Sequence, residues 1–162
     1  TVVVGKSYDT PEFAVNCIDL WFNTFAQKRY QNVKELLILC DGGGSNGSRS
    51  RLWKYYLHQE ICKKYGIGIR VCHYPTGASK WNPVEHRLFG PITNNWQGRP
   101  LRSFEIALEC IQSTSTKKGL RVEAVLNDKE YQKGNKASDS QMKTINLLRH
   151  DELPQWNYSF VP

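Results

Sequence analysis

One short stretch constrains the fold of this chain more than any other, because an apolar run ends on an acidic residue and passes at once into a glycine-rich tract. The run covers residues 36–40 (LLILC), Asp41 follows it, and the tract covers residues 42–49 (GGGSNGSR). A continuous apolar run of this length is typical of a strand that is buried on both faces of a sheet. The stretch therefore predicts a buried strand that carries Asp41 at its carboxyl end.

Strand and helix patterns alternate along the first hundred residues. Strands are expected over residues 1–5, 36–40 and 67–72, and helices over residues 11–25, 49–65 and 82–96. Pro11 suits a first helical turn and either Asp9 or Thr10 can cap that helix, so Asp9 is read as a cap rather than a catalyst. This alternation predicts an α/β fold in which the later strands run parallel.

The remaining residues predict a smaller mixed α+β part. A helix is expected over residues 103–111, a strand over 121–126, and a helix over 139–148 that begins with the capping box of Ser138 and Gln141. The alternating tail, residues 156–160, is expected to pack back on the body. We therefore divide the chain into a core, residues 1–98, and a C-terminal extension, residues 99–162.

Composition fits an ordinary globular protein, and the charge is compatible with a polyanionic partner. The net charge is +7, and residues 41–98 hold eight basic but only three acidic side chains. No apolar run approaches the roughly 20 residues that a membrane helix needs, and the five cysteines show no paired spacing. Reduced thiols in a cytoplasmic protein are therefore expected. A solvated basic face without a partner explains the charge equally well.

Two carboxylates stand where a metal site is expected. Asp41 ends a strand, and Glu85 lies in the first turn of a helix whose start is marked by Asn82 and Pro83. Ligands in open α/β sheets gather at the carboxyl ends of strands, and carboxylate oxygens suit Mg²⁺ or Mn²⁺. Taken singly, Asp41 also fits a turn and Glu85 a capping box. Together, within the basic segment, they predict a shared metal site for phosphodiester chemistry.

Two other sites are compatible with the same stretch. Gly42-x-Gly44-x-x-Gly47 matches a dinucleotide fingerprint between a strand and a helix. Against it, Asp41 would face the pyrophosphate, and no acid ends the following strand to bind a ribose. Zinc at Cys72 and His73 is the other alternative, but no second ligand pair has the required spacing.

Four further side chains near the carboxylates are candidates for DNA contacts. Arg49, Lys80 and Arg87 suit phosphate oxygens, and Trp81 suits stacking on a base or a wedge between bases. Trp81 fits a buried core position equally well. His73 and His86 are candidates to assist at the metal site.

Several long motifs resemble the catalytic core of DDE transposases, in particular those of bacterial insertion sequences of the ISAzo type. The resemblance is carried by residues 8–15 (YDTPEFAV), 37–49 (LILCDGGGSNGSR), 72–89 (CHYPTGASKWNPVEHRLF), 93–98 (TNNWQG), 148–150 and 156–158. It implies a ribonuclease H-like fold and DNA cutting and joining with Mg²⁺ or Mn²⁺. It also implies transposon ends and target DNA as partners, a homo-oligomer on DNA for the full-length protein, and a cytoplasmic, nucleoid-associated protein without a membrane anchor.

Within this resemblance, Asp41 matches the second catalytic Asp and Glu85 the catalytic Glu. The first Asp belongs on a strand upstream of residues 2–4, so the sequence resembles the C-terminal part of a catalytic domain that lacks its first two strands. The strand at residues 2–4 is then expected either to pair directly with residues 36–40 or to detach from that sheet. We expect a fragment that is inactive alone.

The sequence thus leads to one function and two alternatives. The first is a transposase catalytic fragment with Asp41 and Glu85 as catalytic metal ligands. The second is a non-catalytic, basic DNA-binding remnant. The third is an oxidoreductase that binds a dinucleotide through the glycine tract.

Overall fold

Two separate sheets contain the six strands of the computed structural model, which describes residues 1–162 apart from the side chain of Ser79. The smaller sheet pairs β1 (Val2–Gly5) in parallel with β4 (Ala124–Asn127). The larger sheet has the order β2-β3-β6-β5 and is built from β2 (Glu35–Cys40), β3 (Gly68–His73), β6 (Asn157–Phe160) and β5 (Leu147–Arg149). β1 therefore does not pair with β2. Of the two outcomes expected from the sequence, this is the one in which residues 2–4 detach from the sheet of residues 36–40.

Each sheet belongs to its own compact unit of the chain. The first unit comprises residues 1–7 and 77–130, and the second comprises residues 8–76 and 131–162. Both units thus combine segments that are far apart in the sequence. The expected boundary at residue 98 falls inside the first unit, and the division into a core and an extension stays a prediction.

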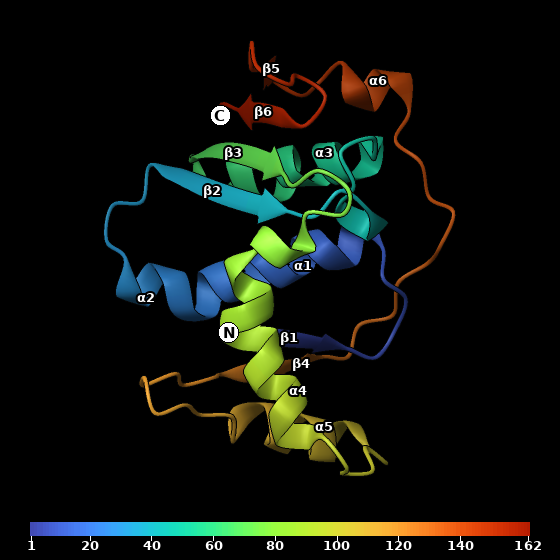
Figure 1. Cartoon of the computed structure of the whole chain (residues 1–162). Coiled ribbons are helices and arrows are strands. Elements are labelled where there is room, and N and C mark those ends of the chain that lie inside the picture. The colour runs from blue at the N-terminus through green and yellow to red at the C-terminus, as the bar shows by residue number, and fades with distance from the viewer. The chain divides into compact units, whose positions relative to one another are not determined.

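The larger sheet confirms the predicted parallel strands. β2 and β3 run parallel with Leu36 opposite Ile69, while β6 pairs antiparallel with both β3 and β5 (Figure 1). A helix joins the two parallel strands, as α/β connections require. It consists of α3 (Arg51–Tyr56) and its π-helical continuation η3 (Leu57–Lys63), and Gly66 follows with a φ of +63°.

The first helix of this unit begins where the sequence predicts. α1 (Pro11–Trp21) has Thr10, not Asp9, as its cap, because the Thr10 hydroxyl accepts a 3.1 Å bond from the Phe13 N–H. The helix continues through a π-helical segment, η1 (Phe22–Ala26), into α2 (Gln27–Arg29). These helices pack on one face of the larger sheet, where Leu57, Ile69 and Tyr158 are fully buried.

The expectation that β2 is buried on both faces is wrong. Leu36 and Ile38 contact the core, but Leu37 and Leu39 on the other face are 56% and 55% exposed. β2 pairs with β3 along one side only within the described sheet, and side chains alternate between faces along a strand. The helices of the second unit cover the face of Leu36, and Leu37 and Leu39 lie on the opposite face, which these helices do not cover.

The first unit packs helices on the β1–β4 pair. Residues 79–96 form η4 (Ser79–Trp81), η5 (Glu85–Phe89) and α4 (Gly90–Trp96), and α5 (Phe104–Gln112) follows. The Ser103 hydroxyl caps α5 by accepting from the Ile106 N–H. Ile92 and Ile111 are buried with Val122 and Ala124 in a separate small core.

The helix expected over residues 139–148 is shorter than predicted. Its capping box is present, since Ser138 and Gln141 bond each other's backbone N–H groups, but α6 ends at Met142 (Asp139–Met142). Residues 147–149 instead form β5, which pairs with β6. The backbone bonds of that pairing override the local preference for helix.

Candidate functional site

Asp41 stands at the carboxyl end of β2 with its side chain exposed. The adjacent strand β3 ends level with it, because Cys40 lies opposite His73 in the parallel register. The chain then forms a loop, residues 42–50, that contains the short 3-10 helix η2 (Gly44–Asn46). The Asn46 amide, oriented to donate, lies 3.3 Å from Asp41 Oδ1 and 2.9 Å from the Gly43 carbonyl. The carboxylate is thus oriented by its own loop.

A buried hydrogen-bond chain fixes the backbone at Asp41. His73 Nδ1 lies 3.0 Å from the Asp41 carbonyl oxygen, and His73 Nε2 lies 3.0 Å from the Tyr158 hydroxyl. The Trp53 indole donates to that same hydroxyl at 3.0 Å. Because a carbonyl only accepts, Nδ1 must carry the hydrogen of the neutral imidazole. Tyr158 accordingly donates to Nε2, and a strand near the end of the chain supports the position of Asp41.

Burial sets the ionisation of this chain of groups. It lowers the pKa of His73, and the bond to the Asp41 carbonyl opposes that shift only in part. It also raises the pKa of Tyr158 above its ordinary value. The neighbouring Cys40 thiol has a pKa raised to about 12, by burial and then by the Asp41 charge. All three groups are therefore neutral near pH 7 and act as structural supports.

A buried lysine, Lys54, contacts the loop of residues 42–50, which we call the glycine loop. Lys54 is 6% exposed, donates to the Ser48 carbonyl at 2.6 Å, and places its Nζ 5.0 Å from the Tyr158 ring centroid. Burial, with a smaller contribution from Arg149, lowers its pKa. Lys54 contributes to the basic excess of residues 41–98, but its ammonium supports the loop instead of facing a partner.

A cavity of about 310 Å³ opens beside this loop at the carboxyl ends of β2 and β3. Its walls are residues 42–44 and 47–50 together with Tyr74, Thr76 and Trp156. A Cβ added at Gly42 would lie 3.2 Å from the Tyr74 carbonyl oxygen, so glycine lets the two walls approach. Sequence reasoning missed Tyr74 and Trp156 here, although both lie in the motifs that carry the family resemblance.

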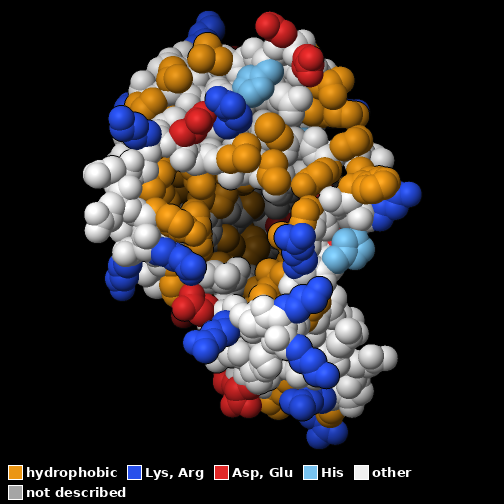
Figure 2. Space-filling model, turned by 60° about the vertical axis from the view of Figure 1, so that its left-hand side comes forward, with side chains coloured by type: hydrophobic (Ala, Val, Ile, Leu, Met, Phe, Trp, Pro, Cys, Tyr) orange, Lys and Arg blue, Asp and Glu red, His pale blue; other side chains and the backbone are white. Residues whose placement is uncertain are grey.

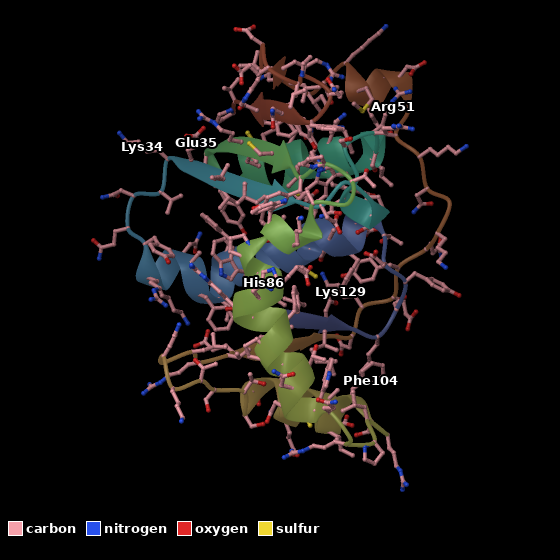
Figure 3. All side chains as sticks on the ribbon, viewed as in Figure 1. Lys34, Glu35, Arg51, His86, Phe104 and Lys129 are labelled. Atoms are coloured by element: carbon pink, nitrogen blue, oxygen red, sulfur yellow. The ribbon has the colours of Figure 1, made fainter. Side chains whose placement is uncertain are left out.

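Glu85 belongs to the first unit, where it lies in the first turn of a helix as predicted. The Asn82 side-chain oxygen accepts from the Val84 N–H at 3.2 Å, and the Glu85 N–H donates to the Asn82 carbonyl at 3.2 Å. The side chain of His86 lies 2.8 Å from the Lys80 carbonyl and ties the helix to the preceding turn. Figure 3 labels His86 on this helix. The Glu85 carboxylate itself is exposed.

The four predicted DNA-contact residues are all exposed. Trp81 is 71% exposed with Lys80 Nζ 5.0 Å from its ring centroid, so the alternative core position is wrong. Arg87 lines a second cavity, of about 550 Å³, together with His86, Pro91, Thr116 and residues 118–120. Figure 2 shows Lys and Arg side chains distributed over one face, with hydrophobic side chains exposed between them.

The structure places the two carboxylates in different units, and a shared metal site stays a prediction. Among the described residues, no group of three or more His, Cys, Asp or Glu side chains is arranged to hold a metal ion. The zinc alternative is not supported, because both ring nitrogens of His73 already bond other groups. Asp41 and Glu85 nevertheless present exposed carboxylate oxygens, which are the donors that Mg²⁺ and Mn²⁺ prefer.

Comparison with known proteins identifies a family. The chain matches the family model described as the Rhodopirellula transposase DDE domain over residues 1–162. No curated protein and no solved structure matches it. None of the helices in the described part of the chain has the length and apolar character needed to cross a membrane.

Proposed function

The chain belongs to the family of the Rhodopirellula transposase DDE domain, and we propose that it takes part in transposition through metal-dependent phosphodiester chemistry on DNA. One observation carries the proposal beyond the family: Asp41 is exposed at the carboxyl end of a parallel strand, beside a glycine loop and a cavity. This edge of a parallel sheet is where α/β proteins bind their ligands.

Asp41 and Glu85 would hold the divalent ion, Mg²⁺ or Mn²⁺, which the family generally uses. When bound, such ions activate the attacking oxygen and stabilise the leaving oxygen of a phosphodiester. The residues of this chain supply the support: Asn46 orients the Asp41 side chain, and His73 fixes its backbone. We propose that these two carboxylates bind the ion in the roles of the second Asp and the Glu of the catalytic set.

Exposed basic and aromatic side chains would hold the DNA. Arg49 lies in the loop that follows Asp41, and Lys80 and Arg87 flank Glu85 in the sequence. Charges that contact phosphates position the nucleic acid without reading its sequence. Trp81 would stack on or wedge against a base, which its exposed ring supports.

The remaining expectations stay part of this proposal. A ribonuclease H-like core is supported by the parallel pair β2–β3 and the helix that joins them. Transposon ends and target DNA are the proposed partners, with a homo-oligomer assembled on DNA. A cytoplasmic, nucleoid-associated location follows from these partners.

The test is the divalent-ion dependence of DNA binding, measured by fluorescence anisotropy with Mn²⁺ or with EDTA. We expect Mn²⁺ to tighten binding, and we expect Asp41→Asn and Glu85→Gln to remove that effect. The exposed acids Asp151 and Glu109, one from each unit, provide the matched controls Asp151→Asn and Glu109→Gln. DNA binding of equal affinity with Mn²⁺ and with EDTA would favour the non-catalytic alternative. Binding of a nicotinamide dinucleotide without DNA binding would favour the oxidoreductase.

A further inference from the structure

The cavity beside the glycine loop is assembled from three chain segments that separate contacts hold in place. Trp156 is anchored through its carbonyl, which accepts from the His73 N–H at 3.1 Å, and Tyr74 through its N–H, which donates to the Cys40 carbonyl at 2.7 Å. The loop is anchored by Lys54 from beneath and by Ser50, whose N–H donates to Gly47 at 2.9 Å. The walls are therefore fixed by the fold before any ligand arrives.

The lining combines one cation with aromatic rings and bare backbone. Arg49 is the charged residue of the lining, and it takes part in none of the ion pairs among the described residues, which involve Arg51, Lys64 and Arg70. Tyr74 and Trp156 are half-buried, and neither ring stacks on another ring of the described residues. Four glycines of the loop leave their share of the wall without side chains.

This combination of side chains suits a binding site for a single nucleotide. A guanidinium binds phosphate oxygens, and an aromatic ring offers a stacking surface to any base. The volume of about 310 Å³ lies at the lower end of the roughly 300–1,000 Å³ typical of small-molecule sites. The cavity therefore suits one nucleotide unit better than a dinucleotide cofactor.

We infer that this cavity binds one nucleotide of a single DNA strand next to Asp41, with Arg49 on its phosphate and Trp156 and Tyr74 against its base or sugar. The inference rests on the proposed function, since it makes DNA the source of the nucleotide. It adds a subsite whose residues Tyr74, Thr76 and Trp156 no sequence argument had assigned. A base can enter such a site only when it is unpaired and unstacked, so the strand must be single-stranded there.

The direct test is the indole N–H spectrum of the chain labelled with ¹⁵N-tryptophan. Five tryptophans give five signals, and Trp156→Leu identifies the one of interest. We expect a short single-stranded oligonucleotide, added in EDTA, to shift the Trp156 signal. A shift of other indoles without Trp156 would overturn the subsite and leave DNA binding by the chain intact. A shift of Trp156 with a nicotinamide dinucleotide, but not with DNA, would overturn both the subsite and the proposed function.

Anisotropy with a fluorescein-labelled single strand then separates the roles of the residues. We expect Trp156→Leu to weaken binding by roughly 5- to 150-fold without changing its salt dependence. We expect Arg49→Gln to lower the slope of log K against log salt by about 0.7, as for the loss of one phosphate contact on single strands. Wild-type values in both variants would contradict the inference.

Control variants come from the end of α2 and the segment that precedes β2. Arg29 and Tyr30 are exposed and precede β2, whose beginning is marked by Lys34 and Glu35 in Figure 3. Arg29→Gln and Tyr30→Leu should bind the single strand as the wild type does. Circular dichroism melting of all four variants excludes unfolding as the cause of lost binding. If the controls lose as much affinity as the cavity variants, binding is diffuse and the subsite is wrong.

Discussion

The Nδ1 atom of His73 lies 3.0 Å from the carbonyl oxygen of Asp41, and this bond joins the ends of two parallel strands at the proposed metal site. The geometry requires a neutral imidazole with its hydrogen on Nδ1, because the carbonyl has no hydrogen to give. His73 therefore acts as a positioning residue for Asp41. Long-range ¹H–¹⁵N correlation spectra of the imidazole should show the Nδ1–H tautomer near pH 7, and an Nε2–H tautomer would contradict the assignment.

The same bond predicts how stability depends on pH. Burial lowers the folded-state pKa of His73 below its ordinary value of 6.5, so the unfolded chain binds a proton more readily as the pH falls. The free energy of unfolding should therefore fall below about pH 6.5, by at most about 1.4 kcal/mol per pH unit for this group. The fall should stop below the folded-state pKa. Urea denaturation between pH 7.5 and pH 5 measures it, and His73→Gln should reduce the dependence.

His58 needs a separate control in that experiment. Burial, and to a smaller extent the nearby Lys63 charge, also lowers its pKa. His58→Gln should remove its own part of the acid dependence and leave the part that belongs to His73. An acid dependence that His73→Gln leaves unchanged would show that His73 is not the buried neutral group inferred here.

Removal of the Tyr158 hydroxyl should destabilise the second unit. Tyr158→Phe leaves the Trp53 indole and His73 Nε2 without their shared partner in a buried site. The expected loss is about 1–3 kcal/mol in the free energy of unfolding. Tyr30→Phe, at a residue that is 54% exposed, should change it by less than about 0.5 kcal/mol. Equal losses in the two variants would contradict the hydrogen-bond chain.

The two faces of the larger sheet should respond differently to truncation. Leu57 is fully buried, and Leu57→Ala should cost about 2–5 kcal/mol. Leu37 is 56% exposed on the other face, and Leu37→Ala should cost less than about 1 kcal/mol. Urea denaturation of both variants is the measurement. A large loss for Leu37→Ala would mean that another part of the protein covers this face.

Lys54 should control the mobility of the glycine loop. Lys54→Met keeps most of the side-chain volume but removes the 2.6 Å bond to the Ser48 carbonyl. Amide hydrogen exchange in residues 42–50 should then become faster, while exchange in β2 and β3 stays near its wild-type rate. Lys63→Met, at an exposed lysine on the same helix, is the control. Unchanged exchange in the loop would show that Lys54 does not hold it.

Local sequence signals predicted much of the fold. The predicted helix start at Pro11 and the predicted capping box at Ser138 are both present, because such signals depend only on neighbouring residues. The parallel pair β2–β3 also follows from the strand–helix–strand order. Two features that depend on distant parts of the chain were not predicted. Residues 147–149 form β5 because they pair with β6, and Leu37 is exposed because the helices of the second unit cover only the opposite face of β2.

In the candidate site, too, local patterns were predicted and contacts between distant segments were not. The sequence pattern located Asp41 at a strand end and Glu85 in a first helical turn, and both positions are confirmed. Nothing local in the sequence connects Tyr158 with His73, since 85 positions separate them. Trp156 likewise reaches the glycine loop only through the pairing of β6 with β3.

A calorimetric titration of the chain with Mn²⁺ tests the shared metal site most directly. If Asp41 and Glu85 share an ion, Asp41→Ala and Glu85→Ala should each abolish binding, and the double variant should be no worse than either. The exposed acids Asp151 and Glu109 supply the controls Asp151→Ala and Glu109→Ala, which should bind as the wild type does. Wild-type Mn²⁺ binding in either Asp41→Ala or Glu85→Ala would contradict the shared site.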